Sequence, residues 1–486
     1  MSDGATQDTT SGFGRGMLLL VLANAVYVIT AYATTTATAR VLDPDDFGGF
    51  GVVMGWISLI TALLVKGLST SIAREMSAGE VDSATAWRAG ARLGLRLSVG
   101  LAVVGAAMSP LAANAFGSGE LASQLAIGAL GSLTFGLNAV LLAWPTGQRQ
   151  YGWQAVAQLS YAVARVALVV GGAMVAGLPG AVIGYVLAPL LAAAPIARRR
   201  PAATSDIAPV AARMARAMVP VAAASAAVTA FFVVDIFAMS AVLGGSARPV
   251  GIYVAYGTVA HVPFFLLQAS SVAMVPAIAA ATDAAGRTDA IRRTLTDTVV
   301  LLAGPTLLLV TAGDAAARVV FGAAYHSERV VVAPLALATA AVTLIAGLVA
   351  VGVAVARMRA VLAISALGVA AVACAAALGA HAADRAPESS VAIAVGIATV
   401  ATFAALAIAV RLTHGGLLYV RRSLAGLALA AATSLPPLLA DDDGLAMGIA
   451  AISGVVWLVL VLRFGLIDLA RAKRIAPDPV ELEPAL

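Results

Sequence analysis

The first part of the chain contains two long apolar runs separated by a short polar link, and this pattern constrains the fold most. The runs cover about residues 17–39 and 47–68, and the link between them contains Asp43 and Pro44. Each run has about 20 residues, enough at ~1.5 Å per residue to cross a ~30 Å hydrocarbon core. Pro44 lacks a backbone N–H and restricts the residue before it, so the first helix ends there. The pattern predicts a transmembrane helical hairpin.

Apolar runs of this kind recur along the whole chain. Hydrophobic residues make up 61% of it and charged residues 11%, whereas a soluble domain has about 25% charged residues. We therefore predict an all-α polytopic membrane protein with about fourteen spans. These spans lie at about 17–39, 47–68, 96–116, 121–143, 153–177, 180–197, 217–243, 250–279, 298–320, 330–356, 360–381, 390–410, 423–440 and 445–463.

Two short matches indicate that the chain contains a repeat. Val41-Leu42 is matched by Val242-Leu243, and Phe116-Gly117 is matched by Phe321-Gly322 at nearly the same offset. Parallel repeats are common in transporters, with the substrate site between the halves. We expect two six-helix bundles related as a repeat, with two additional helices after them. The expected parts are a tail (1–16), the first bundle (17–200), a linker (201–216), the second bundle (217–411), the additional helices (412–463) and a second tail (464–486).

The distribution of basic residues predicts the orientation in the membrane. Of the 30 Lys and Arg residues, 23 fall in the loops and tails on one side of the predicted spans and five on the other. Cytoplasmic loops carry the excess of basic residues in membrane proteins. We therefore expect a multi-pass protein of the cell membrane with both termini in the cytoplasm. Because the basic residues lie beside spans, the net charge of +5 does not indicate nucleic-acid binding.

The sequence lacks the usual signatures of catalysis and of cofactor binding. The four histidines are scattered, and the single cysteine, Cys374, lies in an apolar run. No motif of a nucleotide-binding loop is present. We expect neither an enzyme, nor a cofactor, nor a metal site. Transport would then be driven by an ion gradient, the membrane potential or a substrate gradient.

Three charged residues lie deep inside predicted spans. A charge at the bilayer centre costs ~2.5–3.5 kcal/mol on insertion scales, so such residues face a cavity or a partner. Arg165 lies about 18 Å along its helix from Trp153, too deep for snorkelling, which leaves a cavity role or a structural pair. Lys66 is about 12 Å from Arg74, so it can face a cavity or snorkel to the interface. Asp235 can pair with either cation or bind a coupling proton or Na⁺.

Other polar residues in the spans are weaker candidates. His261 presents the same choice as Asp235, between ion coupling and a structural hydrogen bond. Amide side chains often form hydrogen bonds between membrane helices, so a cavity role is only one of their interpretations. The amides in question are Asn24, Asn138, Gln158 and Gln268.

Three stretches resemble bacterial polysaccharide flippases of the O-antigen type. Residues 39–51 and 67–75 are similar to the start of these proteins, and residues 321–325 are similar to their FG-x-x-Y stretch. These flippases belong to the multidrug/oligosaccharidyl-lipid/polysaccharide exporter superfamily. One position departs from the pattern, because the family often has an acid just before Gly67 and this chain has Lys66. The departure replaces an acidic group in that helix by a cationic one.

The resemblance implies a transporter that flips a polyprenyl-pyrophosphate-linked oligosaccharide from the inner to the outer leaflet by alternating access. A cationic interior suits a pyrophosphate. Besides this glycan, the expected partners are membrane lipids, a glycan polymerase or glycosyltransferases, and no nucleic acid. The predicted substrate-binding residues are Arg165, Lys66, Asn24 and Asn138, and the residues of an ion-coupling site or structural pair are Asp235 and His261.

Three alternatives stay open at this point. A lipid II flippase of the same superfamily also has fourteen spans, and rescue of peptidoglycan precursor export would identify it. A drug antiporter usually has twelve spans, and a cationic cavity would repel organic cations. A non-transporting membrane scaffold of a glycan assembly complex would show no flipping after reconstitution.

Overall fold

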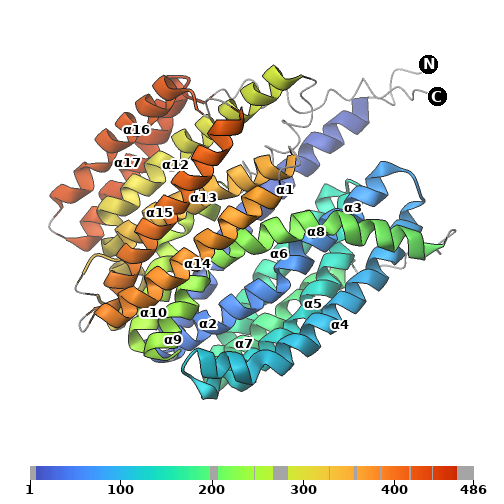
Figure 1. The fold of residues 1–486 in the computed structure, drawn as a ribbon, viewed down its shortest axis with the longest axis horizontal. Coiled ribbons are helices and arrows are strands. Elements are labelled where there is room, and N and C mark those ends of the chain that lie inside the picture. Colours follow the sequence, from blue (N-terminus) through green and yellow to red (C-terminus); the bar gives the residue numbers. More distant parts are fainter. Residues whose placement is uncertain are drawn as a thin grey trace.

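The computed structural model describes residues 7–196, 206–245, 247–265, 267, 283–327, 329–354, 358–383, 386–414, 418–440 and 442–467, and every regular element in these ranges is a helix. Gln268 and the other residues of the predicted eighth span at 266 and 269–279 lie outside these ranges, as do both ends of the chain. Figure 1 shows α2–α7 grouped on one side of the molecule and α12–α17 on the other. The helices of the first group and α1 are α1 (Gln7–Val41), α2 (Pro44–Ala62), η1 (Leu63–Leu68), α3 (Ser69–Ala78), α4 (Ser83–Ala115), α5 (Ala122–Gly147), α6 (Tyr151–Arg165), η3 (Val166–Val170) and α7 (Gly171–Ala193).

The second half contains two broken helical segments before its long helices. The chain leaves helical geometry at Val233, between α8 (Ile207–Phe231) and α9 (Val234–Leu243), and α10 (Arg248–Ala260) is interrupted by a turn at His261. The longer helices that follow are α12 (Ala284–Phe321), α13 (Val332–Ala354), α14 (Met358–Ala382), α15 (Pro387–His414), α16 (Val420–Ser434) and α17 (Asp443–Arg463).

Within the described residues, ten helical segments are long and apolar enough to cross a membrane, against the fourteen spans expected. Part of the difference is the segment Tyr151–Ala193, which counts once but contains two helices. Ala176 and Gly177 have non-helical backbone angles, and a Cβ on Gly172 would lie 2.2 Å from the Gly180 carbonyl oxygen. The segment therefore folds back on itself as a tight hairpin. Another part is α16, which has only 15 residues.

The two Phe-Gly matches of the predicted repeat occupy equivalent places. Phe116-Gly117 ends α4 and Phe321-Gly322 ends α12, and both glycines have positive φ, of 65° and 85°. Glycine adopts this backbone region without a steric penalty. Each phenylalanine then packs on the other half of the chain: Phe116 stacks on Phe237 with ring centroids 4.8 Å apart, and Phe321 lies 6.3 Å from Phe47.

The two groups of helices meet at one end of the molecule, where α2 and α10 cross (Figure 1). A Cβ on Gly251 would lie 1.8 Å from the Pro44 carbonyl oxygen, and a Cβ on Gly48 would lie 3.0 Å from the Gly251 nitrogen. The segment after α12 adds hydrogen bonds to the end of α1 and the residue after it, from the Tyr325 hydroxyl to the carbonyl oxygens of Ala39 and Leu42. We call this set of contacts the seal.

Helix α8 differs from the prediction at its start. It begins at Ile207, inside the stretch 201–216 expected to be a linker, of which residues 201–205 lie outside the described part. Met214 packs in a buried cluster with Leu64 and Leu68, and Arg213 donates a 3.0 Å hydrogen bond to Glu75. The apolar residues among the basic ones explain this packing. The start of α8 therefore lies against the first group of helices.

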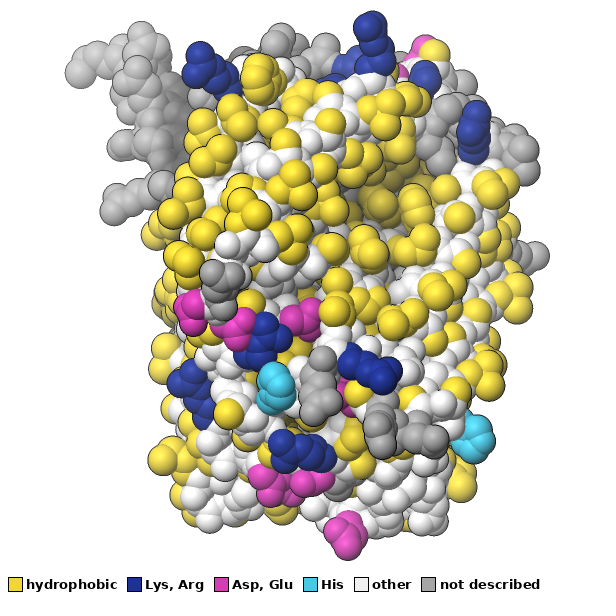
Figure 2. All heavy atoms as spheres, turned by 90° about the vertical axis from the view of Figure 1, so that its left-hand side faces the viewer, with side chains coloured by type: hydrophobic (Ala, Val, Ile, Leu, Met, Phe, Trp, Pro, Cys, Tyr) yellow, Lys and Arg dark blue, Asp and Glu magenta, His cyan; other side chains and the backbone are white. Residues whose placement is uncertain are grey.

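The C-terminal helix pair is attached to α12. Arg318 of α12 forms two hydrogen bonds with Asp443 at the start of α17, of 2.7 and 2.6 Å. Figure 2 shows one face of the molecule, on which hydrophobic side chains form a broad band between basic side chains at the upper edge and charged side chains and histidines in the lower half. An apolar flank of this kind fits contact with lipid tails.

Candidate functional site

Arg165 lies at the end of α6 with only 7% of its surface exposed. One terminal nitrogen of its guanidinium donates a 3.2 Å hydrogen bond to the Tyr27 carbonyl oxygen on α1. The guanidinium carbon lies 4.8 Å from the centre of the Tyr27 ring and 5.4 Å from that of Tyr161. These distances are within the range of cation–π attraction. The charge is therefore held by two aromatic faces and one carbonyl dipole.

The structure does not bring Arg165 and Asp235 together. Among the described residues, Arg165 forms no ion pair, and its Nε is buried without a hydrogen-bond partner. Asp235 instead accepts a 2.5 Å hydrogen bond from the Tyr253 hydroxyl on α10 and a 2.9 Å hydrogen bond from the Ile236 amide. The pairing that the sequence left open is therefore absent from the described part of the chain.

The break between α8 and α9 explains how Asp235 is accommodated. Asp235 lies in the first turn of α9, where backbone N–H groups have no partner in the helix. A carboxylate there satisfies one of them and interacts favourably with the positive end of the helix dipole. Asp235 is only 6% exposed, and these contacts together with Tyr253 offset the cost of burying it.

Both cations inside the predicted spans lie at π-helical segments. Lys66 belongs to η1, and η3 begins directly after Arg165. Segments of π-helix are rare and occur frequently at functional sites. Lys66 is exposed, while its neighbour Gly67 packs tightly on Met218 of α8. The structure gives no contact between Lys66 and Arg165, so the two cations are separate features of the first half.

His261 lies at the break that ends α10. Its ring makes an edge contact with Phe232 at 4.8 Å between centroids, and Phe232 precedes the break between α8 and α9. The two broken segments therefore face each other through this pair. His261 and Asp235 therefore lie in the same region, and the structure shows no direct contact between them.

The predicted amides differ in their surroundings. Asn24 is exposed on α1, one turn before Tyr27. The side-chain oxygens of Asn138 on α5 and Gln158 on α6 are buried and have no hydrogen-bond partner among the described residues. Buried polar groups in proteins are nearly always hydrogen-bonded, so each exception requires an explanation.

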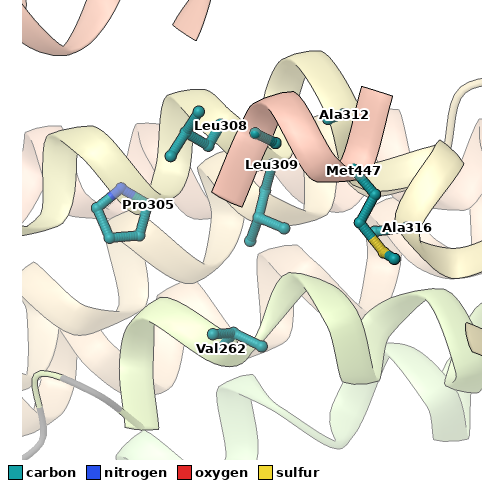
Figure 3. A pocket seen from close by; sticks show the side chains of 8 residues that line it. Val262, Pro305, Leu308, Leu309, Ala312, Ala316 and Met447 are labelled. Atoms are coloured by element: carbon teal, nitrogen blue, oxygen red, sulfur yellow. The ribbon is translucent and has the colours of Figure 1, made fainter. Parts of the chain in front are cut away.

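A cavity lies between α12 and α17 (Figure 3). It has a volume of about 190 Å³ and is lined only by apolar side chains, which Figure 3 shows projecting from α12, from α17 and from the segment after α10. Pro305 and Met447 are among them. This lining accepts hydrocarbon and offers no group that binds an anion. It is therefore distinct from the environment of Arg165.

A comparison with protein families decides the class of the protein. The profile of the polysaccharide biosynthesis protein family matches residues 37–329, which is more than half of the chain. The chain belongs to this family. A comparison with curated protein sequences finds no match.

Solved structures show the fold of this family member. It is similar to the lipid II flippase MurJ in an inward closed conformation, with a TM-score of 0.65 and 12% identity over 93% of this chain and 100% of that one. An inward-facing multidrug resistance transporter of the MATE family has a TM-score of 0.60 and 14% identity, over 81% of this chain and 98% of that one. A MOP superfamily transporter from Pyrococcus furiosus has a TM-score of 0.58 and 15% identity, over 83% of this chain and 96% of that one.

These findings define the polysaccharide biosynthesis protein as an all-helical, multi-pass membrane protein with the fold of the exporter superfamily. Its fold is similar to that of the lipid II flippase MurJ and of a MATE family transporter. At the identities found, the structural likeness concerns the fold alone.

The sequence did not identify the aromatic side chains around Arg165. Tyr161 precedes Arg165 by four residues, a spacing that places both on one face of a helix, so this signal was available. Tyr27 lies 138 residues away, and only the packing of α1 on α6 brings it close. The partner of Asp235, Tyr253, also gave no signal, because tyrosines are common in membrane helices.

Proposed function

We propose that this protein flips a polyprenyl-pyrophosphate-linked oligosaccharide from the inner to the outer leaflet by alternating access, for cell-surface polysaccharide biosynthesis. The observation that carries the proposal is the buried guanidinium of Arg165, which has no carboxylate partner in the described part of the chain. A cation that has no counter-charge inside a membrane protein is costly, even where aromatic rings and a carbonyl oxygen contact it. A ligand anion offsets this cost, and a pyrophosphate matches the planar donors of arginine.

The proposal includes an arrangement in the membrane. It has fourteen spans with both termini in the cytoplasm, which agrees with the distribution of basic residues between the two sides. The first bundle ends near residue 200 and the second near residue 411. The seal then lies on the outer side. Its hydrogen bonds and glycine contacts support a state closed to the outside, from which the substrate would be loaded at the inner leaflet.

Lys66 and Asn24 are the further substrate contacts of the proposal. Both are exposed, and both belong to helices of the first half. Asp235 and His261 are proposed to couple transport to a proton or Na⁺, because both lie beside broken helices, where backbone groups are available to an ion. A structural role for the two is the alternative.

The test measures transport by the purified protein in vesicles. The lipid-linked oligosaccharide of the source cells is one substrate and lipid II is the other. Arg165→Met keeps an unbranched apolar side chain and removes the charge, so we expect normal expression and a loss of oligosaccharide flipping of about 100-fold, the effect of losing one strong charge contact. Arg165→Lys should retain part of the activity.

Three outcomes would contradict the proposal. Normal flipping by well-expressed Arg165→Met would rule out the substrate role of this side chain. Flipping of lipid II with no flipping of the oligosaccharide would identify a lipid II flippase, whose known structure shares this fold. A wild-type protein that moves neither lipid would favour the scaffold.

A further inference from the structure

The face of α6 that carries Arg165 is polar over several turns. Gln158 lies seven residues before Arg165, and Tyr161 lies between them. At 100° per residue, these three side chains fall within about 60° of one another around the helix. Gln158 therefore points to the same side as Arg165, about 10 Å further along the helix axis.

Asn138 lies at the same level on α5. The ring of Phe135 on α5 packs edge-on against Tyr161 at 6.5 Å between centroids. The two helices run antiparallel, because a short turn at residues 148–150 joins them. Gln158 precedes Tyr161 by three residues and Asn138 follows Phe135 by three residues, so both lie displaced from this contact in the same direction. The two amides are thus brought to one level between neighbouring helices.

The unpartnered atoms at this level are both hydrogen-bond acceptors. They are Oδ1 of Asn138 and Oε1 of Gln158, each buried and without a partner among the described residues. A phosphate group has only acceptor oxygens, so it cannot satisfy them. Hydroxyl groups and amide N–H groups can. The surrounding rings of Phe135, Tyr161 and Tyr185 form an aromatic cluster, which suits the apolar face of a pyranose ring.

From these observations we infer that Asn138 and Gln158 bind the hydroxyl-bearing sugar next to the pyrophosphate, while Arg165 holds the pyrophosphate itself. The inference rests on the proposed function. The backbone positions of Gln158 and Arg165 lie about 10 Å apart along the axis of α6, a length comparable to a pyrophosphate and one sugar ring. The amides lie nearer than Arg165 to the turn at residues 148–150, so the glycan extends toward that end of the first bundle.

The test compares the binding of two lipids by native mass spectrometry of the purified protein. One is polyprenyl diphosphate, and the other is the lipid-linked oligosaccharide of the source cells. The variant combines Asn138→Leu with Gln158→Met, which keep the size of both side chains. Gln124→Met is the matched control, because Gln124 is also an amide on α5 but already accepts a hydrogen bond from Ser123.

We expect the wild type and the control to bind the oligosaccharide lipid about ten-fold more tightly than the sugar-free lipid, as two hydrogen bonds would give. The double variant should lose this preference and keep its affinity for the sugar-free lipid, which also shows that it is folded. An unchanged preference, or an equal loss of both lipids, would overturn the inference and leave the proposed function intact. A wild type that binds neither lipid would overturn both.

Discussion

The hydroxyl of Tyr325 donates a 2.7 Å hydrogen bond to the carbonyl oxygen of Ala39. The bond joins the segment after α12 to the end of α1, across 286 residues of sequence. Burial raises the pKa of Tyr325 above its ordinary value, and the negative charge of Asp43 adds to this effect. The hydroxyl therefore remains protonated throughout the physiological range, and this contact of the seal does not depend on pH there.

Tyr325→Phe is expected to open the seal more often. The loss of one buried hydrogen bond costs about 1 kcal/mol, which corresponds to an increase of about five-fold in the ratio of open to closed molecules. The measurement is the rate at which a membrane-impermeant maleimide labels Leu42→Cys in a background of Cys374→Ser. Tyr419→Phe is the control, since the Tyr419 hydroxyl also forms a hydrogen bond, to Asp289, but far from the seal along α12. Equal labelling rates in the two variants would contradict the prediction.

Gly251→Ala is expected to destabilise the closed form. The added Cβ would lie 1.8 Å from the Pro44 carbonyl oxygen, so α2 and α10 must separate. Overpacking of this kind costs roughly 1–3 kcal/mol, and thermal unfolding in detergent should show a lower Tm. Gly448→Ala is the control, because nothing lies within 4 Å of the Cβ position there. The close approach of the two helices would be refuted by equal Tm values for both variants.

Asp235→Asn is expected to impair transport more than stability. Asp235 accepts from Ile236 through Oδ1 and from Tyr253 through Oδ2. The single oxygen of an asparagine can keep the bond from Ile236, and its NH2 group can donate to the Tyr253 hydroxyl. The Tm should therefore change little, whereas the group can no longer bind a proton. Flipping in vesicles, with and without a proton or Na⁺ gradient, measures the effect. Tyr253→Phe is the companion variant, since it keeps the carboxylate and its bond to Ile236 and should still respond to the gradient. If Asp235→Asn flips at the wild-type rate under the same gradient, Asp235 has no coupling role.

Reporter fusions test the orientation. A fusion after Arg200 is expected to report the cytoplasm, and a fusion after Asp443 the outside, because the basic residues divide unequally between the two sides. Alkaline phosphatase activity, which requires export, and fluorescence of a cytoplasmic reporter give the two measurements. The opposite result at either site would exclude the fourteen-span arrangement.

The class of the protein could be predicted from sequence because the length of each apolar run can be counted directly along the chain. The burial of Arg165 followed from the same reasoning, since its distance from the ends of its span could be counted. The breaks at Val233 and His261 could not be predicted this way, because the apolar runs continue through them. The start of α8 was missed because its basic residues resemble a loop, whereas Met214 and its apolar neighbours pack on η1.

The surroundings of the predicted site residues were beyond the sequence for a different reason. Tyr27 reaches Arg165 and Tyr253 reaches Asp235 only through the packing of separate helices, and one sequence carries no information on which helix faces meet. The Phe-Gly pairs are the exception. Their offset indicated a repeat, and the positive φ of Gly117 and Gly322 gives a physical reason why glycine occurs in both places.

The hairpin formed by α6 and α7 limits how the cation can move. A Cβ on Gly184 would lie 2.0 Å from the carbonyl oxygen of Leu168, so the two backbones touch one turn beyond Arg165. No side chain separates them that could change rotamer and let one helix slide. Arg165 is therefore fixed to α7 and can be displaced only together with the whole hairpin. Tyr27, which also contacts Arg165, lies on a separate helix, α1. Release of a bound anion would therefore depend on motion of α1 relative to the rigid hairpin of α6 and α7.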